Sequence, residues 1–244
     1  MVHSYRGGTG KTLLSTNLAA AYSKTEKVCL LDYDFRAPSL HKMFDVPTPK
    51  FWVNDFLNGD CEITEALSEV YPNLYVGLAC PDADAIRDMM GKSRIWETEA
   101  LKLTVSLKET LNGNGFNKLI FDTTPGLAYS SINAVVGSDA VALVMRMDIL
   151  DILGTKEMMK GVYELLERPS FVVVNMVLQA QQEAFASTLE KVFGKQTLAY
   201  IPCLCEVRSL IAKGKVVLID EKLEYSSAII KLSKDIENFC KNQN

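Results

Sequence analysis

The sequence lacks long apolar runs, a targeting segment and a strong net charge. No apolar stretch reaches the roughly 20 residues that a membrane-spanning helix needs, and no charged segment followed by an apolar one opens the chain. These absences argue against a helical membrane protein and predict a cytoplasmic one. A formal net charge of −4 gives no general attraction to DNA or to anionic lipid. DNA or membrane association would therefore need a local basic or amphipathic surface.

Histidine is scarce and cysteine is scattered. The two histidines, His3 and His41, are too few and too far apart in sequence for a zinc site. Among the six cysteines only Cys203 and Cys205 are close, and their C-x-C spacing is not the C-x-x-C of strong metal or redox sites. We expect reduced thiols that behave mainly as small apolar side chains.

Short apolar runs and helical patterns alternate along the 244 residues. Residues 2–4 are expected to form a short strand. Six further runs have the continuous apolar character of strands that are buried on both faces: 27–32, 74–79, 118–122, 140–145, 171–177 and 197–201. Eight helical patterns separate and follow them: 11–23, 82–90, 94–111, 129–136, 148–166, 181–193, 206–213 and 225–241. This order predicts an α/β fold with a doubly wound, mostly parallel sheet of about seven strands flanked by helices, with residues 1–244 in a single domain.

Two further segments carry structural expectations. The stretch 47–58 has two prolines and Trp52, and we expect it to be a mobile surface segment with an exposed indole. The pattern at 225–241 is an amphipathic helix, best interpreted as a packing helix. A membrane-binding helix is the alternative, but acidic residues dilute its basic ones.

A glycine-rich turn, Arg6-Gly7-Gly8-Thr9-Gly10-Lys11-Thr12, lies near the amino terminus between a predicted strand and a predicted helix. Glycines let backbone N–H groups converge on an anion, and the helix amino terminus adds its positive dipole end. Residues Gly7 to Leu13 would surround the phosphates of ATP, with Lys11 on the β- and γ-phosphates and Thr12 on Mg²⁺. The pattern G-x-x-x-x-G-K-[ST] is incomplete, because Tyr5 stands where its first glycine belongs. A glycine-rich turn that binds no nucleotide is the alternative.

Carboxylates follow two of the predicted strands. Asp32 and Asp34 end the strand at 27–32, where Asp32 would hold Mg²⁺-bound water and Asp34 would orient the attacking water. Asp122 ends the strand at 118–122 and begins D-x-x-P-G, a pattern typical of a Walker B site that supports the Mg²⁺ shell. Gly126 would let this loop respond to the γ-phosphate. By itself, D-x-D after a strand is also compatible with an ordinary turn.

With these three elements, the chain resembles the MinD/ParA family of deviant Walker A ATPases, and MinD-type members most. The resemblance covers nearly the whole length. It implies that Asn175, at the end of Val172-Val173-Val174-Asn175, reads the adenine, and that Ile201-Pro202 begins a second adenine-side loop.

The resemblance also implies a mechanism. ATP would be held between two protomers, with Arg6 in place of the family's signature lysine reaching across to the partner's phosphates. ATP hydrolysis would be slow without an activating protein, and the output would be intracellular positioning, partitioning or division-site regulation. Arg6 paired within its own subunit is the alternative.

Other functions stay open. The stretch 34–44 resembles the D-x-R-x-P-S-L-H-x-x-F segment of bacterial-type tyrosine kinases, although Tyr225 is the one tyrosine near the terminus. Cys203 and Cys205 keep an iron–sulphur carrier ATPase in consideration. A nucleotide-binding module without turnover is not favoured, because Asp32, Asp34 and Asp122 are all present. Basic Lys213 and Lys215 are candidates for DNA contact, diluted by Asp220, Glu221 and Glu224.

Overall fold

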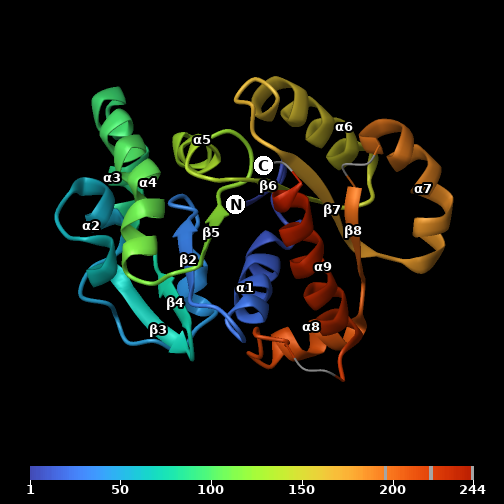
Figure 1. Cartoon of the computed structure of the whole chain (residues 1–244), viewed down its shortest axis with the longest axis horizontal. Coiled ribbons are helices and arrows are strands. Elements are labelled where there is room, and N and C mark those ends of the chain that lie inside the picture. Colours follow the sequence, from blue (N-terminus) through green and yellow to red (C-terminus); the bar gives the residue numbers. More distant parts are fainter. Residues whose placement is uncertain (195–196, 220–221, 243–244) are drawn as a thin grey trace.

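The computed structural model describes residues 1–194, 197–219 and 222–242, and its strands form one twisted sheet flanked by helices (Figure 1). The strands are β1 Val2–His3, β2 Val28–Tyr33, β3 Leu67–Tyr71, β4 Leu74–Gly77, β5 Lys118–Thr123, β6 Val141–Met145, β7 Ser170–Val177 and β8 Thr197–Pro202. The α-helices are α1 Lys11–Tyr22, α2 Val53–Asn58, α3 Ala83–Met90, α4 Arg94–Gly113, α5 Tyr129–Val136, α6 Ile149–Met158, α7 Gln179–Phe193, α8 Cys205–Ala212 and α9 Glu224–Lys241. Shorter turns are the 3₁₀-helices η1 Leu40–Lys42 and η2 Ile63–Ala66 and the π-helical turn η3 Met159–Tyr163.

The strand order is β3-β4-β2-β5-β1-β6-β7-β8, and every neighbouring pair is parallel except β3–β4. The doubly wound α/β fold is confirmed, with eight strands instead of about seven. The additional strand, β3, lies at the edge and is half-exposed. Its sequence, Leu67-Ser68-Glu69-Val70-Tyr71, mixes polar and apolar residues, so it has no continuous apolar run of the kind that marks the buried strands.

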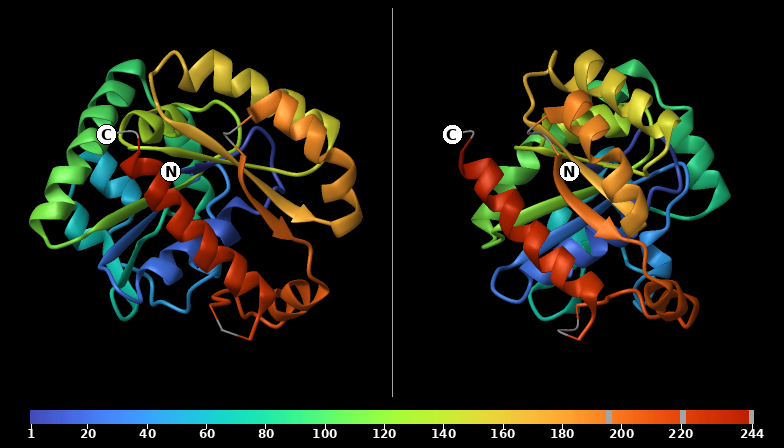
Figure 2. Two further views of the ribbon diagram at one scale, coloured as in Figure 1. Left: turned by 45° about the vertical axis from the view of Figure 1, so that its right-hand side comes forward. Right: turned by 90° about the vertical axis from the view of Figure 1, so that its right-hand side faces the viewer.

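Helices cover both faces of the sheet. Apolar residues of α1, α8 and α9 pack on one face, and those of α2, α4, α5, α6 and α7 pack on the other. Figure 2 shows α9 crossing the first face beside α1. Ile229 and Leu232 of α9 are fully buried there, and the Tyr22 hydroxyl of α1 donates to the Ser233 carbonyl at 2.8 Å. The prediction of a packing helix is confirmed, because the apolar stripe faces the core.

The expectation of a mobile surface segment at 47–58 is wrong for its second half, while residues 47–52 form no helix or strand. Its second half forms α2, in which Val53 is fully buried and Phe56 is 5% exposed. The Asp55 carboxylate accepts the N–H of Trp52 at 2.7 Å, and the Asn54 amide oxygen accepts the N–H of Cys80 at 2.8 Å. Trp52 itself is partly buried against the core. A six-residue helix is too short to show a 3.6-residue period, so the prolines dominated the sequence pattern.

The helix predicted at 148–166 is also shorter than expected. Asp148 caps it by accepting the N–H groups of Leu150 and Asp151, and the α-helical part ends at Met158. The next turn, η3, is π-helical. Among the described residues, no helix has both the length and the apolar character that crossing a bilayer requires.

Candidate functional site

The loop between β1 and α1 has the backbone that its glycines predict. Gly8 and Gly10 have φ values of +77° and +87°, in the region that side chains other than hydrogen disfavour. A Cβ atom on Gly10 would lie 2.4 Å from the Asn175 amide nitrogen, so a larger residue cannot fit there without movement. The amino terminus of α1 begins directly after Gly10, at Lys11. Loop and helix end together form a site suited to anions.

Lys11 is held close to two carboxylates. Its side chain is largely withdrawn from solvent, at 7% exposure. Burial lowers the pKa of Lys11, while the charges of Asp122 and Asp34 oppose that shift. An ammonium group in this position would gain from an anionic ligand, since a bound phosphate restores the charge balance that burial disturbs.

Asp32 and Asp122 lie opposite one another in the sheet register of β2 and β5. Both are buried, and burial raises the pKa of Asp32 well above its ordinary value and that of Asp122 to about 6. The charges of Asp122 and Asp34 raise the pKa of Asp32 further. The Thr12 hydroxyl and the charge of Lys11 hold the pKa of Asp122 down. The Asp122 Oδ1 atom has no hydrogen-bond partner among the residues that the structure describes.

These residues fit a divalent cation. An unpartnered carboxylate oxygen of Asp122 beside the Thr12 hydroxyl is the hard oxygen donor set that Mg²⁺ prefers. Asp32 is less free, because its Oδ1 accepts the Asp34 N–H at 3.1 Å and its Oδ2 accepts the N–H groups of Ser39 and Leu40 at 3.3 and 3.2 Å. Asp32 therefore holds the segment after β2 in place next to the loop.

Asp34 connects the loop after β2 to the loop after β5. Its Oδ1 accepts the Thr124 hydroxyl at 2.9 Å and the N–H groups of Arg36 and Ala37 at 3.3 and 3.0 Å. The side chain is only partly buried. It is thus fixed in position yet reaches solvent, as a residue that orients a water must.

Arg6 forms two long ion pairs inside its own subunit. Its guanidinium lies 3.7 Å from Asp148 and 3.6 Å from Asp151, and its side chain is 42% exposed. Asp151 is buried and is held more closely by Arg146, whose Nε donates at 3.1 Å. The structure of the single chain thus contains the pairing within the subunit, and the contact across a dimer stays a prediction.

The residues predicted to lie beside adenine are at the ends of the last two strands. Asn175 is buried, and its amide donates to the Thr9 carbonyl at 2.8 Å, which ties β7 to the phosphate loop. Pro202 ends β8, and the next N–H, of Cys203, donates to the Val177 carbonyl of β7 at 2.9 Å. Leu13, in the first turn of α1, is half-buried and packs against the core on that face of the sheet. The sheet therefore brings Asn175 beside the loop; adenine recognition by Asn175 and Pro202 stays a prediction.

Sequence reasoning missed the residues that hold the predicted ones. Thr124 anchors Asp34, and Asp148 and Asp151 hold Arg6. A helix-capping pattern, D-x-x-D, was the only local signal for the two carboxylates. Their relation to Arg6 is not visible in the sequence, because more than 140 residues separate them.

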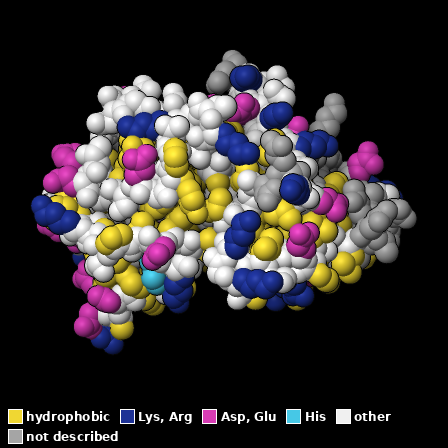
Figure 3. All heavy atoms as spheres, turned by 90° about the horizontal axis from the view of Figure 1, so that it is seen from below, with side chains coloured by type: hydrophobic (Ala, Val, Ile, Leu, Met, Phe, Trp, Pro, Cys, Tyr) yellow, Lys and Arg dark blue, Asp and Glu magenta, His cyan; other side chains and the backbone are white. Residues whose placement is uncertain are grey.

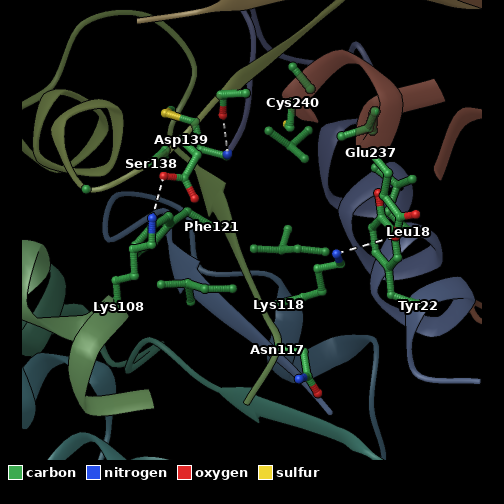
Figure 4. Close-up of a pocket in the computed structure, with 18 of the residues that line it drawn as sticks. Leu18, Tyr22, Lys108, Asn117, Lys118, Phe121, Ser138, Asp139, Glu237 and Cys240 are labelled. Atoms are coloured by element: carbon green, nitrogen blue, oxygen red, sulfur yellow. Dashed lines mark hydrogen bonds and ion pairs between the residues drawn. The ribbon is translucent and has the colours of Figure 1, made fainter. Parts of the chain in front are cut away.

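A pocket of about 1170 Å³ lies away from the candidate site, near the amino ends of β1, β5 and β6 (Figure 4). Two of its lysines are already paired: Lys108 with Asp139 at 2.6 Å, and Lys118 with Glu26 and Glu237 at 3.3 and 3.4 Å. None of the predicted site residues lines it. It is therefore not the candidate site.

Two basic residues, Lys213 and Lys215, directly follow α8. Figure 3 shows Lys and Arg side chains on the half of the lower face that α8 occupies, with Asp and Glu among them. Lys213 and Lys215 are exposed after α8. Asp220 and Glu221, which we expected to dilute them, fall outside the described residues, and DNA contact stays a prediction.

Comparisons with known proteins agree with this geometry. Residues 1–217 match the family described as CbiA, the CobQ/CobB/MinD/ParA nucleotide binding domain. An uncharacterized ATP-binding protein of Methanocaldococcus jannaschii is 26% identical over 89% of the chain and 79% of its own length. The chromosome partitioning protein ParA of Caulobacter vibrioides is 24% identical over 96% and 92%.

The fold is also that of a solved protein. The septum site-determining protein MinD of Pyrococcus horikoshii, complexed with Mg-ADP, superposes with a TM-score of 0.83 at 20% identity, covering 100% of this chain and 97% of that one. With a family match over residues 1–217, the chain belongs to the CobQ/CobB/MinD/ParA nucleotide-binding family.

Proposed function

We propose that the chain is a Mg²⁺-dependent ATP-binding and ATP-hydrolysing dimerisation switch of the MinD/ParA type, with residues 1–217 and the rest of the chain acting as one ATPase domain. One observation carries the proposal. The buried Lys11 side chain, the Thr12 hydroxyl and the unpartnered Asp122 oxygen lie together at the end of a loop that accepts only glycine at position 10. A triphosphate with its Mg²⁺ is the ligand whose charges complement all three.

Each loop residue has a role in this proposal. Backbone groups of Gly7 to Gly10 bind phosphate, Lys11 bears on the β- and γ-phosphates, and Leu13 lies in the first turn of α1 below them. Thr12 and Asp122 would hold Mg²⁺, and Asp32 would bind its water. When bound, Mg²⁺ supplies neutralisation of the phosphate charge.

Hydrolysis would depend on Asp34. Its contact with Thr124 fixes the carboxylate beside the Asp122 loop, where it can orient a water toward the γ-phosphate. Asp34→Ala should leave ATP affinity intact and slow ATP hydrolysis by about 10²–10⁴-fold, the usual range for a lost general base. Single-turnover hydrolysis measures this step. A turnover rate equal to that of the unchanged chain would remove Asp34 from the mechanism.

Dimerisation would depend on Arg6. Ion pairs of 3.6 and 3.7 Å to a half-exposed side chain are weak, because solvent screens them. Arg6 can therefore leave Asp148 and Asp151 at small energetic cost. A guanidinium that reaches a partner's phosphates can accelerate phosphoryl transfer by roughly 10³–10⁵.

Arg6→Ala should bind ATP as a monomer and fail to dimerise with it. We expect sedimentation with a non-hydrolysable ATP analogue to give a dimer for the unchanged chain and a monomer for the variant, while calorimetric titration finds similar affinities. Arg87→Ala is the matched control, because Arg87 is a 75% exposed arginine on α3. Lys11→Ala, by contrast, should lose affinity for ATP. An Arg6→Ala dimer with the analogue would contradict the role in trans.

The cellular output follows the relatives. A positioning, chromosome-partitioning or division-site role, with a regulatory or activating protein, fits the names of the matched ParA and MinD proteins. The kinase alternative has one relative behind it, since a putative tyrosine-protein kinase CapB of Staphylococcus aureus is 25% identical over 62% of the chain. Against it, Tyr225 is only 3% exposed in α9 and cannot be phosphorylated without unfolding that helix's first turn. Cys203 and Cys205 form no group of three or more metal-binding side chains with other described residues.

A further inference from the structure

The imidazole of His3 is fully buried, and both ring nitrogens are hydrogen-bonded. Nε2 lies 2.9 Å from the Gly126 carbonyl oxygen, and Nδ1 lies 2.6 Å from the Tyr163 hydroxyl. His3 and Tyr163 have no exposed surface, and their rings meet edge to face at a centroid distance of 6.2 Å. Phosphate binding, hydrolysis and dimerisation, as proposed above, use neither side chain.

The two hydrogen bonds have a fixed direction. Because a carbonyl oxygen can only accept, Nε2 carries the proton, and the neutral Nδ1 accepts the Tyr163 hydroxyl. Burial lowers the pKa of His3 to about 4, so the ring stays neutral at pH 7. Tyr163, His3 and Gly126 thus form one directed chain of hydrogen bonds.

The chain joins two segments that matter to the site. Gly126, with φ of +71°, closes the loop after β5 that carries Asp122 and Thr124, and its N–H donates to the Ser4 carbonyl at 2.9 Å. Tyr163 ends the π-helical turn η3, which directly continues α6. Turns of this type are rare and occur frequently at functional sites. The first turn of α6 holds Arg6 through Asp151.

Movement at either end would leave buried groups without partners. If the Gly126 carbonyl turned away, the His3 N–H would lose its acceptor in a site closed to solvent. If η3 shifted, the hydrogen bond between the Tyr163 hydroxyl and His3 Nδ1 would break. Unpaired buried polar groups are costly, so the loop and the helix favour moving together between discrete arrangements.

We propose that His3 and Tyr163 are positioning residues that couple the loop of Asp122 to α6, so that the nucleotide state of the loop sets how firmly α6 retains Arg6. The coupling rests on the proposed nucleotide function and adds a regulatory connection to it. Through this connection the bound nucleotide would act on Arg6 by way of α6, and not only through the phosphate loop.

Tyr163→Phe tests the coupling, because it removes one hydroxyl and keeps the buried ring. Tyr22→Phe is the matched control: Tyr22 is 8% exposed, and its hydroxyl also makes a hydrogen bond, to Ser233 at 2.8 Å on the other face of the sheet. Both variants should keep the ATP affinity of the unchanged chain in calorimetric titration. The ratio of dimerisation constants with a non-hydrolysable ATP analogue and with ADP should fall roughly three- to tenfold in Tyr163→Phe only, the effect of one hydrogen bond.

Hydrogen exchange gives a second readout. Amides of residues 148–163 should exchange differently with the analogue and with ADP in the unchanged chain, and this difference should shrink in Tyr163→Phe. His3→Phe combined with Tyr163→Phe should add little to either single change, because each breaks the same connection.

Three results would overturn the coupling: an unchanged ratio in Tyr163→Phe, an equal loss in Tyr22→Phe, or no nucleotide-dependent exchange at 148–163 in the unchanged chain. Failure of the unchanged chain to bind nucleotide would instead refute the proposed function, and the coupling would fall with it. Failure of the coupling alone leaves binding and dimerisation intact, so the two failures are distinguishable.

Discussion

At the scale of single residues, the candidate site holds ionisable side chains in buried positions, where their charged forms are disfavoured. Lys11, Asp32 and Asp122 are all buried, and burial alone disfavours each charged form. Asp122 also keeps an oxygen without a hydrogen-bond partner in the described part of the chain. Such groups lower the stability of the empty protein, and a ligand with complementary charge relieves them. The burial of these charged groups therefore opposes folding of the empty protein, whereas the hydrogen bonds of Asp32 also hold the segment after β2.

His3 makes stability depend on pH in a defined direction. Its pKa of about 4 in the folded chain lies below its ordinary 6.5, so the unfolded chain takes up a proton first. Its contribution is fully present above pH 6.5 and is lost as pH falls toward 4, by about 3 kcal/mol. Urea unfolding at pH 7, 5.5 and 4.5 should show this loss in the unchanged chain and a shallower one in His3→Gln.

His41→Gln is the control for this measurement, since burial also lowers the pKa of His41 but its side chain remains partly exposed. It should alter the pH dependence far less than His3→Gln does. Identical slopes for His3→Gln and the unchanged chain would show that His3 is not the titrating group.

At the scale of elements, the short helix α2 is part of the core, although the two prolines before it suggest a loop. Val53, Phe56 and Leu57 are buried in one core cluster with residues of the sheet and of α4. Packing against that cluster gives the helix a stability that six residues alone do not have. The same reasoning applies to β3, which is stabilised by its pairing with β4.

Phe56→Ala should therefore destabilise the chain by about 3–5 kcal/mol, the usual cost of removing a buried phenylalanine ring. Ile95→Ala is the control, because Ile95 is 78% exposed in α4 and should change stability by less than about 0.5 kcal/mol. Chemical denaturation without nucleotide measures both. Near-equal midpoints for the two variants would mean that α2 is not packed as described.

At the scale of the whole molecule, α6 presents an apolar surface next to the Arg6 site. Ile149, Leu150 and Leu153 are 62%, 58% and 52% exposed. Grouped apolar side chains on one helix are typical of a surface that another molecule covers. Asp148 and Asp151, which hold Arg6, lie on the same helix end. A second copy that receives Arg6 would therefore meet these side chains.

Leu153→Glu should prevent ATP-dependent dimerisation while leaving the monomer's stability and ATP affinity unchanged, because the side chain is exposed and only the dimer would bury its charge. Leu165→Glu is the control, as Leu165 is 76% exposed beyond η3. Sedimentation with a non-hydrolysable ATP analogue distinguishes them. A Leu153→Glu dimer of undiminished affinity would place the interface elsewhere.

Much of the fold and of the candidate site could be predicted because the signals are local. Buried parallel strands need continuous apolar runs, and the phosphate loop needs glycines at successive positions, so both can be recognised within ten residues. Asp32 and Asp122 were found because each directly follows such a run, and parallel strands end at the same edge of the sheet. Edge strand β3 and the six-residue α2 have no comparable pattern.

The sequence by itself determined the phosphate loop, the carboxylates after β2 and β5, and the parallel sheet that brings them together, since short-range sterics and apolar periodicity decide each of them. Only the tertiary structure decided what holds Arg6, what fixes Asp34 and what bonds to the His3 ring. Those contacts join residues that are 90 to 160 positions apart along the chain. Their geometry depends on how helices pack on the sheet, a long-range property that no local pattern records.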